Sequence, residues 1–332
     1  MINFIQFTLT RAFLSIVTLL IVCFIVFSLM ELVPGTCAER YLAFKNTQGS
    51  QITFEDIAAE EKRLGLDKPF LYRYTKWVSD IVIKQDFGDS CILRISINEL
   101  LSGRFVLSLT IAITALLFSY AIAIPVGIIS ATTKYASLDN ALKFISYLGI
   151  ALPNFLVALC IMLFMTVYYG DTMTGLFSQE YENAPWSSAK VQDFLSRAWL
   201  PIFVLGWNAT AFALQTVRAL MLDENDKLYV MAARARGVSG MSLLWRYPAK
   251  HSLGPVINSI GFDLNRIFSA LPVVALILIL TEAGALLIEA LARSNDQQLA
   301  GAIIFLLTAT IVFVNFVTDI ILAIMDPRIR KG

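Results

Sequence analysis

Long apolar runs alternate with polar segments along the chain. A bilayer core about 30 Å thick requires about 20 apolar residues per helix. Six runs of this kind occupy 12–30, 105–133, 144–170, 198–217, 252–281 and 297–318. The fifth of them contains two charged residues, Asp263 and Arg266, and the others contain none. The pattern therefore predicts an all-α polytopic membrane protein with six transmembrane helices.

The polar segment between the first two runs has a helical pattern of its own. Apolar residues recur on one side of it, and Glu60 to Arg63 would face water. The sequence Asp67-Lys68-Pro69 should divide it into two helices, because proline disfavours helix at the preceding residue. We therefore predict an N-terminal segment with span one at 1–30, an extracytoplasmic helical insertion at 31–104, and a membrane core at 105–332 that contains a cytoplasmic loop at 221–251.

The composition agrees with this topology. Hydrophobic residues make up 57% of the chain and charged residues 15%, whereas soluble domains carry about 25% charge. The first run is preceded by Arg11 and therefore resembles a signal peptide. No small-residue cleavage site follows it, and the run is longer than a signal h-region, so we predict a retained helix.

Basic residues in the short loops predict the orientation. The loops and termini on one side of the membrane contain Arg11, Lys134, Lys143, the segment 218–250, Arg328, Arg330 and Lys331. The opposite short loops contain only Lys190, Arg197 and Arg293 against seven acids. Both termini are therefore predicted to be cytoplasmic. The 31–104 segment is placed outside despite its basic residues, because long translocated segments escape the charge rule.

Residues for enzymatic chemistry are missing from the sequence. There is no Walker A phosphate-binding loop and no H-E-x-x-H or C-x-x-C motif, and His251 is the only histidine. We predict no catalytic site, no metal site and no cofactor in this chain. His251 is better explained by packing at the membrane boundary than by metal ligation.

The four cysteines divide into two pairs. Cys23 and Cys160 lie within apolar runs, where cysteine packs as a small apolar side chain. Cys37 and Cys91 both fall in the outer segment, where an oxidising compartment permits a disulfide. The sequence leaves open whether these two are bonded or are separate thiols.

Polar residues within the apolar runs are candidates for a transport pathway. Asp263 and Arg266 are three residues apart and can pair on one helix face, either as a structural pair or as part of a functional site. The uncharged candidates for the pathway are Asn208, Gln215 and Asn265. The alternative for each is a hydrogen bond between helices.

Residues 218–250 form the densest basic segment of the cytoplasmic loops. The composition of 228–236 favours a helix that Gly237 would end, and a second short helix would follow Ser239. Ala232, Ala233 and Ala235 would leave a low surface for a partner protein. Binding to anionic lipid headgroups is the alternative, and it explains the arginines but not the alanine and glycine spacing.

Motifs along nearly the whole chain resemble one family of transport proteins. Ala232-Ala233-Arg234-Ala235-Arg236-Gly237 resembles the "EAA" loop of binding-protein-dependent ABC importer permeases. Further marks place the resemblance with the B-type subunit of the oligopeptide, dipeptide and nickel uptake family. They are Tyr229-Val230, Arg246, Pro255-Val256-Ile257, Pro34-Gly35, Leu64 to Pro69, Tyr74, Trp77, Asp86-Phe87-Gly88, Ser90, Pro125-Val126-Gly127, Asp139, Pro153-Asn154-Phe155, Asn315, Asp319 and Asp326 to Arg330.

The resemblance implies a type I ABC importer permease fold and a set of partners. These would be a second homologous permease, two ATPase subunits that bind ATP and Mg, an extracytoplasmic substrate-binding protein and membrane lipid, with no nucleic acid. It implies that Ala232, Ala233, Arg234, Arg236 and Gly237 contact the ATPase. It further implies a bacterial inner-membrane location and a cargo that is most often a peptide.

The chain departs from the family pattern at a few positions. Met231 stands where the motif has glutamate, and Thr36-Cys37 follows Pro34-Gly35 in place of Asp-Pro. Ala275 replaces another glutamate, and Thr281-Glu282-Ala283-Gly284 replaces Pro-Gly-Leu-Gly. Two other classes of function stay open on the residues alone, a proton-coupled secondary carrier and a membrane receptor or scaffold.

Overall fold

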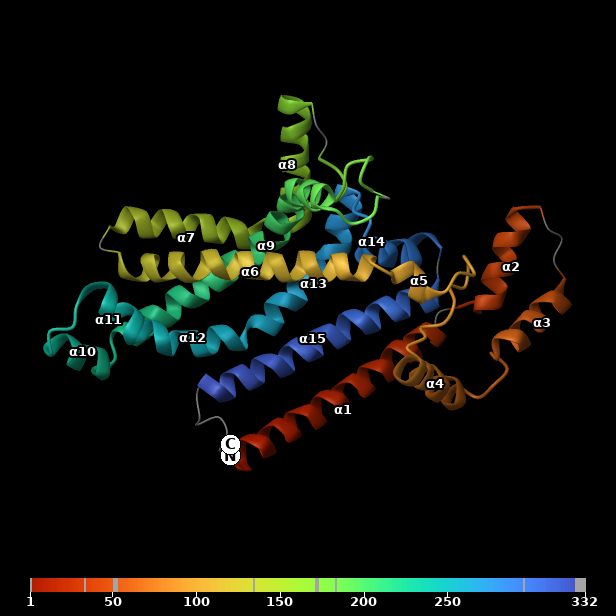
Figure 1. The fold of residues 1–332 in the computed structure, drawn as a ribbon, viewed down its shortest axis with the longest axis horizontal. Helices are drawn as coiled ribbons and strands as arrows, with labels where there is room; N and C mark the ends of the chain where they lie inside the picture. Colours follow the sequence, from red (N-terminus) through yellow and green to blue (C-terminus); the bar gives the residue numbers. More distant parts are fainter. Residues whose placement is uncertain are drawn as a thin grey trace. The chain divides into compact units, whose positions relative to one another are not determined.

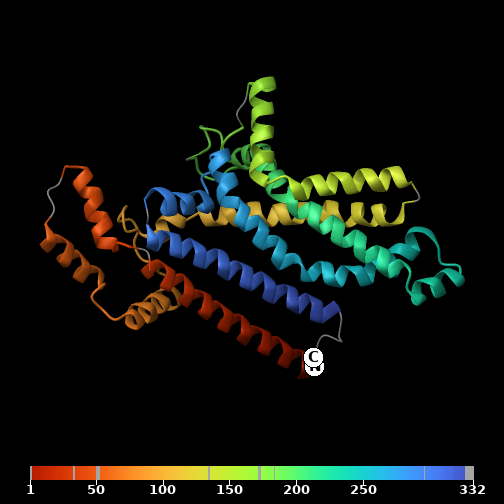
Figure 2. The ribbon, with the colours of Figure 1, turned by 180° about the vertical axis from the view of Figure 1, so that it is seen from behind.

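The computed structural model describes residues 2–32, 34–49, 53–133, 135–170, 173–182, 184–294 and 296–325. Within these ranges the fold is helical, with one isolated β-bridge between Asp89 and Ser96 and no strand (Figures 1 and 2). Four basic residues used to predict orientation, Lys134, Arg328, Arg330 and Lys331, lie outside the described residues, as does the rest of the Asp326 to Arg330 motif.

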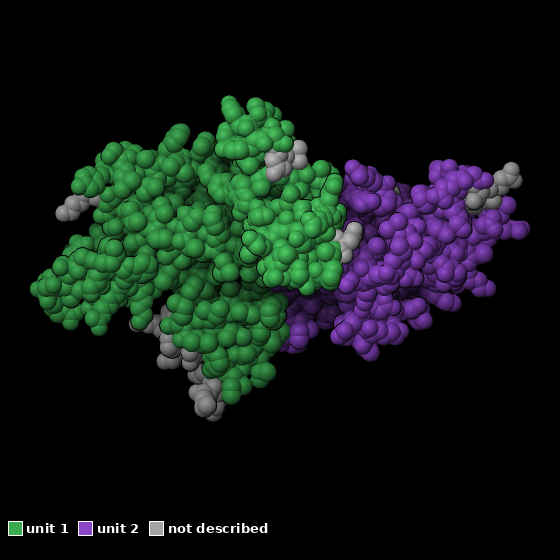
Figure 3. Space-filling model, turned by 45° about the horizontal axis from the view of Figure 1, so that its top comes forward, with its two compact units in different colours: residues 1–12, 109–280, 313–332 green, residues 13–108, 281–312 purple. Residues whose placement is uncertain are grey.

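The chain divides into two compact units, coloured separately in Figure 3. Unit 1 comprises Met1–Ala12, Leu109–Leu280 and Phe313–Gly332. Unit 2 comprises Phe13–Ser108 and Thr281–Val312. Three long helices each contribute residues to both units, α1 (Ile2–Leu32), α6 (Arg104–Thr132) and α15 (Gln297–Met325).

Unit 1 is built around α9 (Ser188–Asn225), which is flanked by four other helices. These are α7 (Ala136–Ala151), α8 (Asn154–Tyr169), α12 (Pro248–Asn258) and α13 (Ile260–Leu278). Two short helices, α10 (Leu228–Ala235) and α11 (Gly240–Arg246), connect α9 to α12. They lie at the same end of unit 1 as the end of α6 and the start of α7 (Figures 1 and 2).

Within the described residues, five helices are long and apolar enough to cross a membrane, and the pair α7 and α8 makes up to six if it counts as one span. The prediction of six spans is confirmed in this form, and the apolar run 144–170 is divided between two helices. α7 and α8 meet at a bend of 102°. Pro153 favours a break here, because its ring disfavours helix at Leu152, which is extended with φ −86° and ψ 120°.

Two other boundaries differ from the sequence pattern. The expected helix over 252–281 divides into α12 and α13 at Ser259. The expected span at 198–217 is the apolar centre of the much longer α9, which begins at Ser188 and continues to Asn225. Ser187 starts α9 early, because its side chain accepts a hydrogen bond from the Lys190 N–H.

A contact between small residues joins α7 to α9. A β-carbon built on Gly149 would lie 2.7 Å from the β-carbon of Ala211, so only glycine allows this separation. Two hydrogen bonds of 3.2 Å flank the contact: Ser146 Oγ donates to the Ala211 carbonyl, and Asn208 Nδ2 donates to the Gly149 carbonyl. Close approach of this kind is typical of helices in membranes, where packing replaces the hydrophobic effect.

Unit 2 contains most of α1 and the helical 31–104 segment. That segment forms α2 (Cys37–Thr47), α3 (Phe54–Leu64), α4 (Phe70–Ser79), the π-helical turn Asp80–Lys84 and α5 (Ile97–Leu101). The break expected at Asp67-Lys68-Pro69 is confirmed, since α3 ends before it and α4 begins after it. The unit is completed by α14 (Ala283–Ile288), the π-helical turn Glu289–Arg293 and the first half of α15.

Aromatic rings fasten α4 to α1 within unit 2. Phe27 lies 5.7 Å from Tyr74 and 5.6 Å from Trp77 between ring centroids. Trp77 in turn meets Phe305 of α15 at 5.9 Å, beside a small core that includes the buried Cys23. The insertion therefore packs on the parts of α1 and α15 that belong to unit 2.

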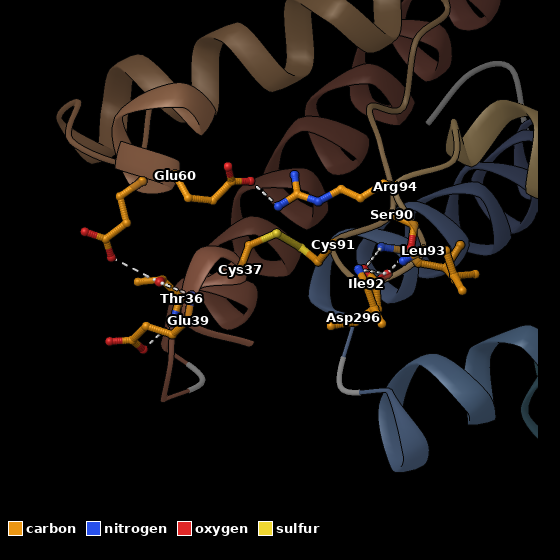
Figure 4. Close-up of a disulfide and its surroundings, with 12 residues drawn as sticks. Thr36, Cys37, Glu39, Glu60, Ser90, Cys91, Ile92, Leu93, Arg94 and Asp296 are labelled. Carbon is orange, nitrogen blue, oxygen red and sulfur yellow. Dashed lines mark hydrogen bonds and ion pairs between the residues drawn. A yellow bond between two sulfur atoms is a disulfide. The ribbon is translucent and has the colours of Figure 1, made fainter. Parts of the chain in front are cut away.

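Cys37 and Cys91 form a disulfide in unit 2, with their Cα atoms 5.4 Å apart (Figure 4). The residue before Cys91, Ser90, donates a 2.5 Å hydrogen bond to Asp296. Asp296 also accepts a 3.0 Å hydrogen bond from the Leu299 N–H and so caps the start of α15. The disulfide and this carboxylate therefore hold the start of α2, the 89–96 loop and α15 in one cluster.

Candidate functional site

A cavity of about 400 Å³ lies within unit 1, between α8, α9 and α13. Its polar lining residues are Asn154, Asn208, Asn265, Arg266 and Ser269, and the remainder are apolar or proline. The structure thus brings together Asn208 and Asn265, two of the three residues predicted for a pathway. Gln215 does not line this cavity, and its buried Nε2 has no hydrogen-bond partner among the described residues.

The predicted pair of Asp263 and Arg266 is present, with an Nη1 to Oδ1 distance of 3.2 Å. The two side chains differ in environment, because that of Asp263 is 4% exposed and that of Arg266 is 44% exposed. Tyr120 of α6 donates a 2.6 Å hydrogen bond to Asp263 Oδ2. The guanidinium of Arg266 lies over the ring of Phe212, 3.7 Å from its centroid. The carboxylate is therefore enclosed by helices, and the guanidinium reaches the cavity.

The segment of α10 and α11 has a small core of its own. Val230, Ala233 and Leu243 are buried in it, and Tyr229 and Tyr247 pack against them. Ala233, predicted to contact an ATPase, is fully buried inside this core. The interpretation of its side chain as exposed surface is wrong, because the methyl group fills the space between α10 and α11.

Gly237 ends α10 in a left-handed conformation, with φ +86°. Its N–H donates to the Arg234 carbonyl at 2.9 Å, and the Val238 N–H donates to the Ala233 carbonyl at 3.1 Å. This pair of bonds is the Schellman arrangement, which requires a positive φ and therefore favours glycine. The predicted helix stop at Gly237 is confirmed, as is the second helix after Ser239.

The outer side of α10 and α11 combines apolar and basic side chains. We call the exposed residues Leu228, Met231, Ala232, Arg234, Arg236, Gly237, Met241 and Trp245 the α10–α11 surface. Leu228 is 80% and Met241 64% exposed, and Arg234 donates a 2.7 Å hydrogen bond to Asn225 at the end of α9. Large exposed apolar side chains gathered on one element mark a surface for a protein or a membrane.

Tyr229 connects this segment to the bundle. Its hydroxyl is hydrogen-bonded to Glu224 of α9, and its ring lies 5.0 Å from that of His251 in α12. Burial, followed by the hydrogen bond to the Glu224 carboxylate, raises the pKa of Tyr229 well above its ordinary value. The phenol is therefore neutral at physiological pH, and His251 packs against it as the sequence suggested.

A cluster of charged and polar side chains lies between α6, α7 and α9. Arg218 of α9 forms two hydrogen bonds of 2.9 Å to the two oxygens of Asp139 in α7. Ser130 of α6 donates to the same carboxylate at 2.6 Å, and Lys143 lies 3.0 Å from it. A paired arginine and carboxylate of this geometry fixes orientation as well as distance. The cluster therefore holds three helices together near the end of α9.

We expect Asp139→Leu to lower the free energy of unfolding of the protein by about 2–3 kcal/mol, and Arg218→Leu to lower it by less. Hydrogen bonds to charged groups contribute about 1.5–3 kcal/mol. Asp139→Leu leaves the Arg218 guanidinium mostly enclosed without its carboxylate, whereas Arg218→Leu leaves Asp139 with Lys143 and Ser130 as partners. The double variant should recover at least half of the summed loss, because neither member of the enclosed pair of Arg218 and Asp139 is left without the other. Lys143, which also pairs with Asp139, is more exposed to solvent. Thermal unfolding of the four proteins in detergent measures this, and strictly additive losses would contradict it.

Two charged residues have partners that the sequence pattern did not indicate. Glu282 is fully buried in unit 2, where it caps α14 by accepting hydrogen bonds from the Gly284 N–H at 2.7 Å and the Ala285 N–H at 3.0 Å. Ser108 of α6 also donates to it, and burial raises the pKa of Glu282. Asp319 of α15 forms a 3.2 Å ion pair with Arg11 of α1 in unit 1. An acid before a short apolar helix is a capping signal that could have identified Glu282.

Comparison with known proteins identifies the family of the chain. The family described as "Binding-protein-dependent transport system inner membrane component" matches residues 123–331, and the corresponding N-terminal family matches residues 4–96. The chain is 28% identical to the oligopeptide transport system permease protein AppB of Bacillus subtilis, over 98% of this chain and 99% of the relative.

Two other similar proteins are also permeases. The inner membrane ABC transporter permease protein YejB of Escherichia coli O157:H7 is 30% identical, covering 83% of this chain and 76% of its own length. The dipeptide transport system permease protein DppB of Escherichia coli K12 is 25% identical, covering 98% of both chains.

A solved structure shares the fold. A chain of the MetNI methionine ABC transporter, in an inward-facing conformation, matches with a TM-score of 0.55 and 16% identity, covering 69% of this chain and 97% of that chain. The chain therefore belongs to the family of binding-protein-dependent transport system inner membrane components, and it is a multi-pass inner-membrane permease of the ABC importer type rather than an ATPase.

Proposed function

We propose that this permease imports peptides and forms half of the translocation pathway of an ATP-driven complex. The proposal that the cargo is a peptide rests on the alignment with an oligopeptide permease and a dipeptide permease, each over 98% of this chain. The cavity beside α13 supports a pathway, since Asn208, Asn265 and Arg266 meet there.

The α10–α11 surface is the proposed contact with an ATPase subunit. Ala232, Arg234, Arg236 and Gly237 are exposed on it, as are the large apolar side chains of Leu228 and Met241. Ala233 takes part indirectly, by holding α10 against α11. Movement of the ATPase would pass through Tyr229 and Glu224 into α9, and through Tyr229 and His251 into α12.

The complex has a proposed composition of two permeases and two ATPases. The second permease would be a homologue of this chain, and an extracytoplasmic binding protein would deliver the cargo. ATP and Mg would bind to the ATPase subunits and not to this chain. Both termini and the α10–α11 surface would face the cytoplasm, and the Cys37–Cys91 disulfide would face the oxidising side.

The test is reconstitution of the complex in liposomes together with the binding protein. ATP should drive uptake of a radiolabelled tripeptide, and the permease without its ATPases should transport none. Uptake by this chain alone, driven by a pH gradient without ATP, would establish a proton-coupled carrier and exclude the proposal. Unchanged peptide uptake after deletion of the gene would favour a receptor or scaffold.

A further inference from the structure

The guanidinium of Arg266 contacts Asp263 at one edge and the ring of Phe212 on one face. Nη1 donates to Asp263 at 3.2 Å, and the ring of Phe212 lies 3.7 Å from Cζ. A guanidinium carries five N–H donors in a planar fork. Among the described residues, Asp263 is the only acceptor that the structure gives it. Most of its donors are therefore available on the side of the cavity that Arg266 lines.

Asp263 also accepts hydrogen bonds from residues other than Arg266. Oδ2 accepts a 2.6 Å hydrogen bond from Tyr120 of α6, and Ser259 lies 3.4 Å from the same oxygen. The pair with Arg266 uses one nitrogen and one oxygen, whereas Arg218 and Asp139 use two of each. Asp263 thus positions and orients the arginine but leaves the fork without a bidentate partner.

The cavity has the size and the second polar group that a peptide end requires. Its volume of about 400 Å³ falls within the roughly 300–1,000 Å³ of small-molecule sites. Asn154, at the start of α8, also lines it, and Asn154 Oδ1 is buried without a hydrogen-bond partner among the described residues. The cavity therefore presents a cation and is lined by a residue whose side-chain oxygen is an unsatisfied acceptor.

We propose that Arg266 binds the C-terminal carboxylate of the cargo peptide in this cavity, with Asn154 accepting a hydrogen bond from a peptide N–H. The proposal rests on the proposed function, since it assigns a subsite for the same cargo. A carboxylate matches the planar fork with two parallel hydrogen bonds, and arginine is suited to this because it stays charged and stacks on aromatic rings. Asp263 and Tyr120 are positioning residues for Arg266.

The experiment uses the full complex in liposomes with ATP and two tripeptides of one sequence, one with a free C-terminus and one amidated. The ratio of variant to wild-type uptake is taken for each peptide separately, so the preference of the binding protein cancels. Arg266→Gln should lower uptake of the free-acid peptide about tenfold, equivalent to about 1.4 kcal/mol, and change uptake of the amide less than twofold. Arg266→Lys should give an intermediate loss, and the exposed Arg293→Gln serves as the matched control.

An equal loss for both peptides, or no loss for either, would overturn the proposal. So would failure of the Arg266→Gln chain to assemble with its partners, since that would assign Arg266 to a subunit contact. An amidated peptide with an internal aspartate separates a C-terminal carboxylate from a side-chain carboxylate, and its uptake should not change with this substitution.

A second measurement does not depend on peptide transport. Acetate should slow modification of Arg266 by phenylglyoxal in the purified complex at least about threefold, measured by peptide mass spectrometry, and acetamide should not. If the wild-type complex imports no peptide, the proposed function fails, and the protection by acetate still decides whether Arg266 binds a carboxylate. Equal modification with acetate and acetamide would refute the site.

Discussion

Gly149→Ala should destabilise the permease by about 1–3 kcal/mol, the usual cost of inserting a methyl group into a filled contact. The new β-carbon would lie 2.7 Å from Ala211 Cβ, an atom that no side-chain rotation can move. α7 must therefore withdraw from α9, which stretches the hydrogen bonds of Ser146 and Asn208 across the same contact. Thermal unfolding in detergent measures the loss, and Gly149→Leu should prevent folding.

A second-site change provides the control for this prediction. Ala211→Gly removes the opposing methyl group, so Gly149→Ala together with Ala211→Gly should recover most of the stability. Gly254→Ala in α12 is matched in chemistry but open in space, with no atom within 4 Å of its β-carbon, and should be neutral or slightly stabilising. A double variant no more stable than Gly149→Ala would show that the short distance is not the cause.

The positions of the spans could be predicted from the sequence because burial in lipid requires long apolar runs. The bend between α7 and α8 could not, since Pro153 only raises the odds of a break and the angle depends on packing against α9. The fifth run divides at Ser259, and the break itself contains neither proline nor glycine. Local composition thus located the helices, and tertiary contacts decided where they bend.

The candidate site shows the same division between local and tertiary information. The helix stop at Gly237 and the i to i+3 pair of Asp263 with Arg266 depend on neighbours in sequence, and both were predictable. The roles of Tyr120, Phe212 and Asn154 around Arg266 depend on α6, α9 and α8 coming together. The burial of Ala233 could not be predicted for this reason, because it depends on α11 folding back over α10.

Gly237→Val should reduce ATP-driven peptide uptake at least about tenfold while the chain remains in the membrane with its partners. A non-glycine residue in the left-handed region costs about 1–2 kcal/mol, and valine also restricts the backbone by its branched β-carbon. Gly237 has φ +86°, and no atom lies within 4 Å of the position that a β-carbon would take, so the effect comes from backbone strain and not from a clash within the chain. Relief of that strain would break the two bonds that end α10 and turn α11 away from it.

Two variants separate coupling from general instability. Gly237→Asn should keep at least half of the uptake, because asparagine tolerates the left-handed region better than other residues. Gly65→Val places the same strain at the end of α3, where φ is +70° and the space is also open, and it should leave uptake within twofold of the wild type. Uptake, ATP hydrolysis and co-purification of the ATPase are measured on the same preparations. Normal uptake by Gly237→Val, or an equal loss in Gly65→Val, would show that the conformation at Gly237 does not transmit the motion of the ATPase.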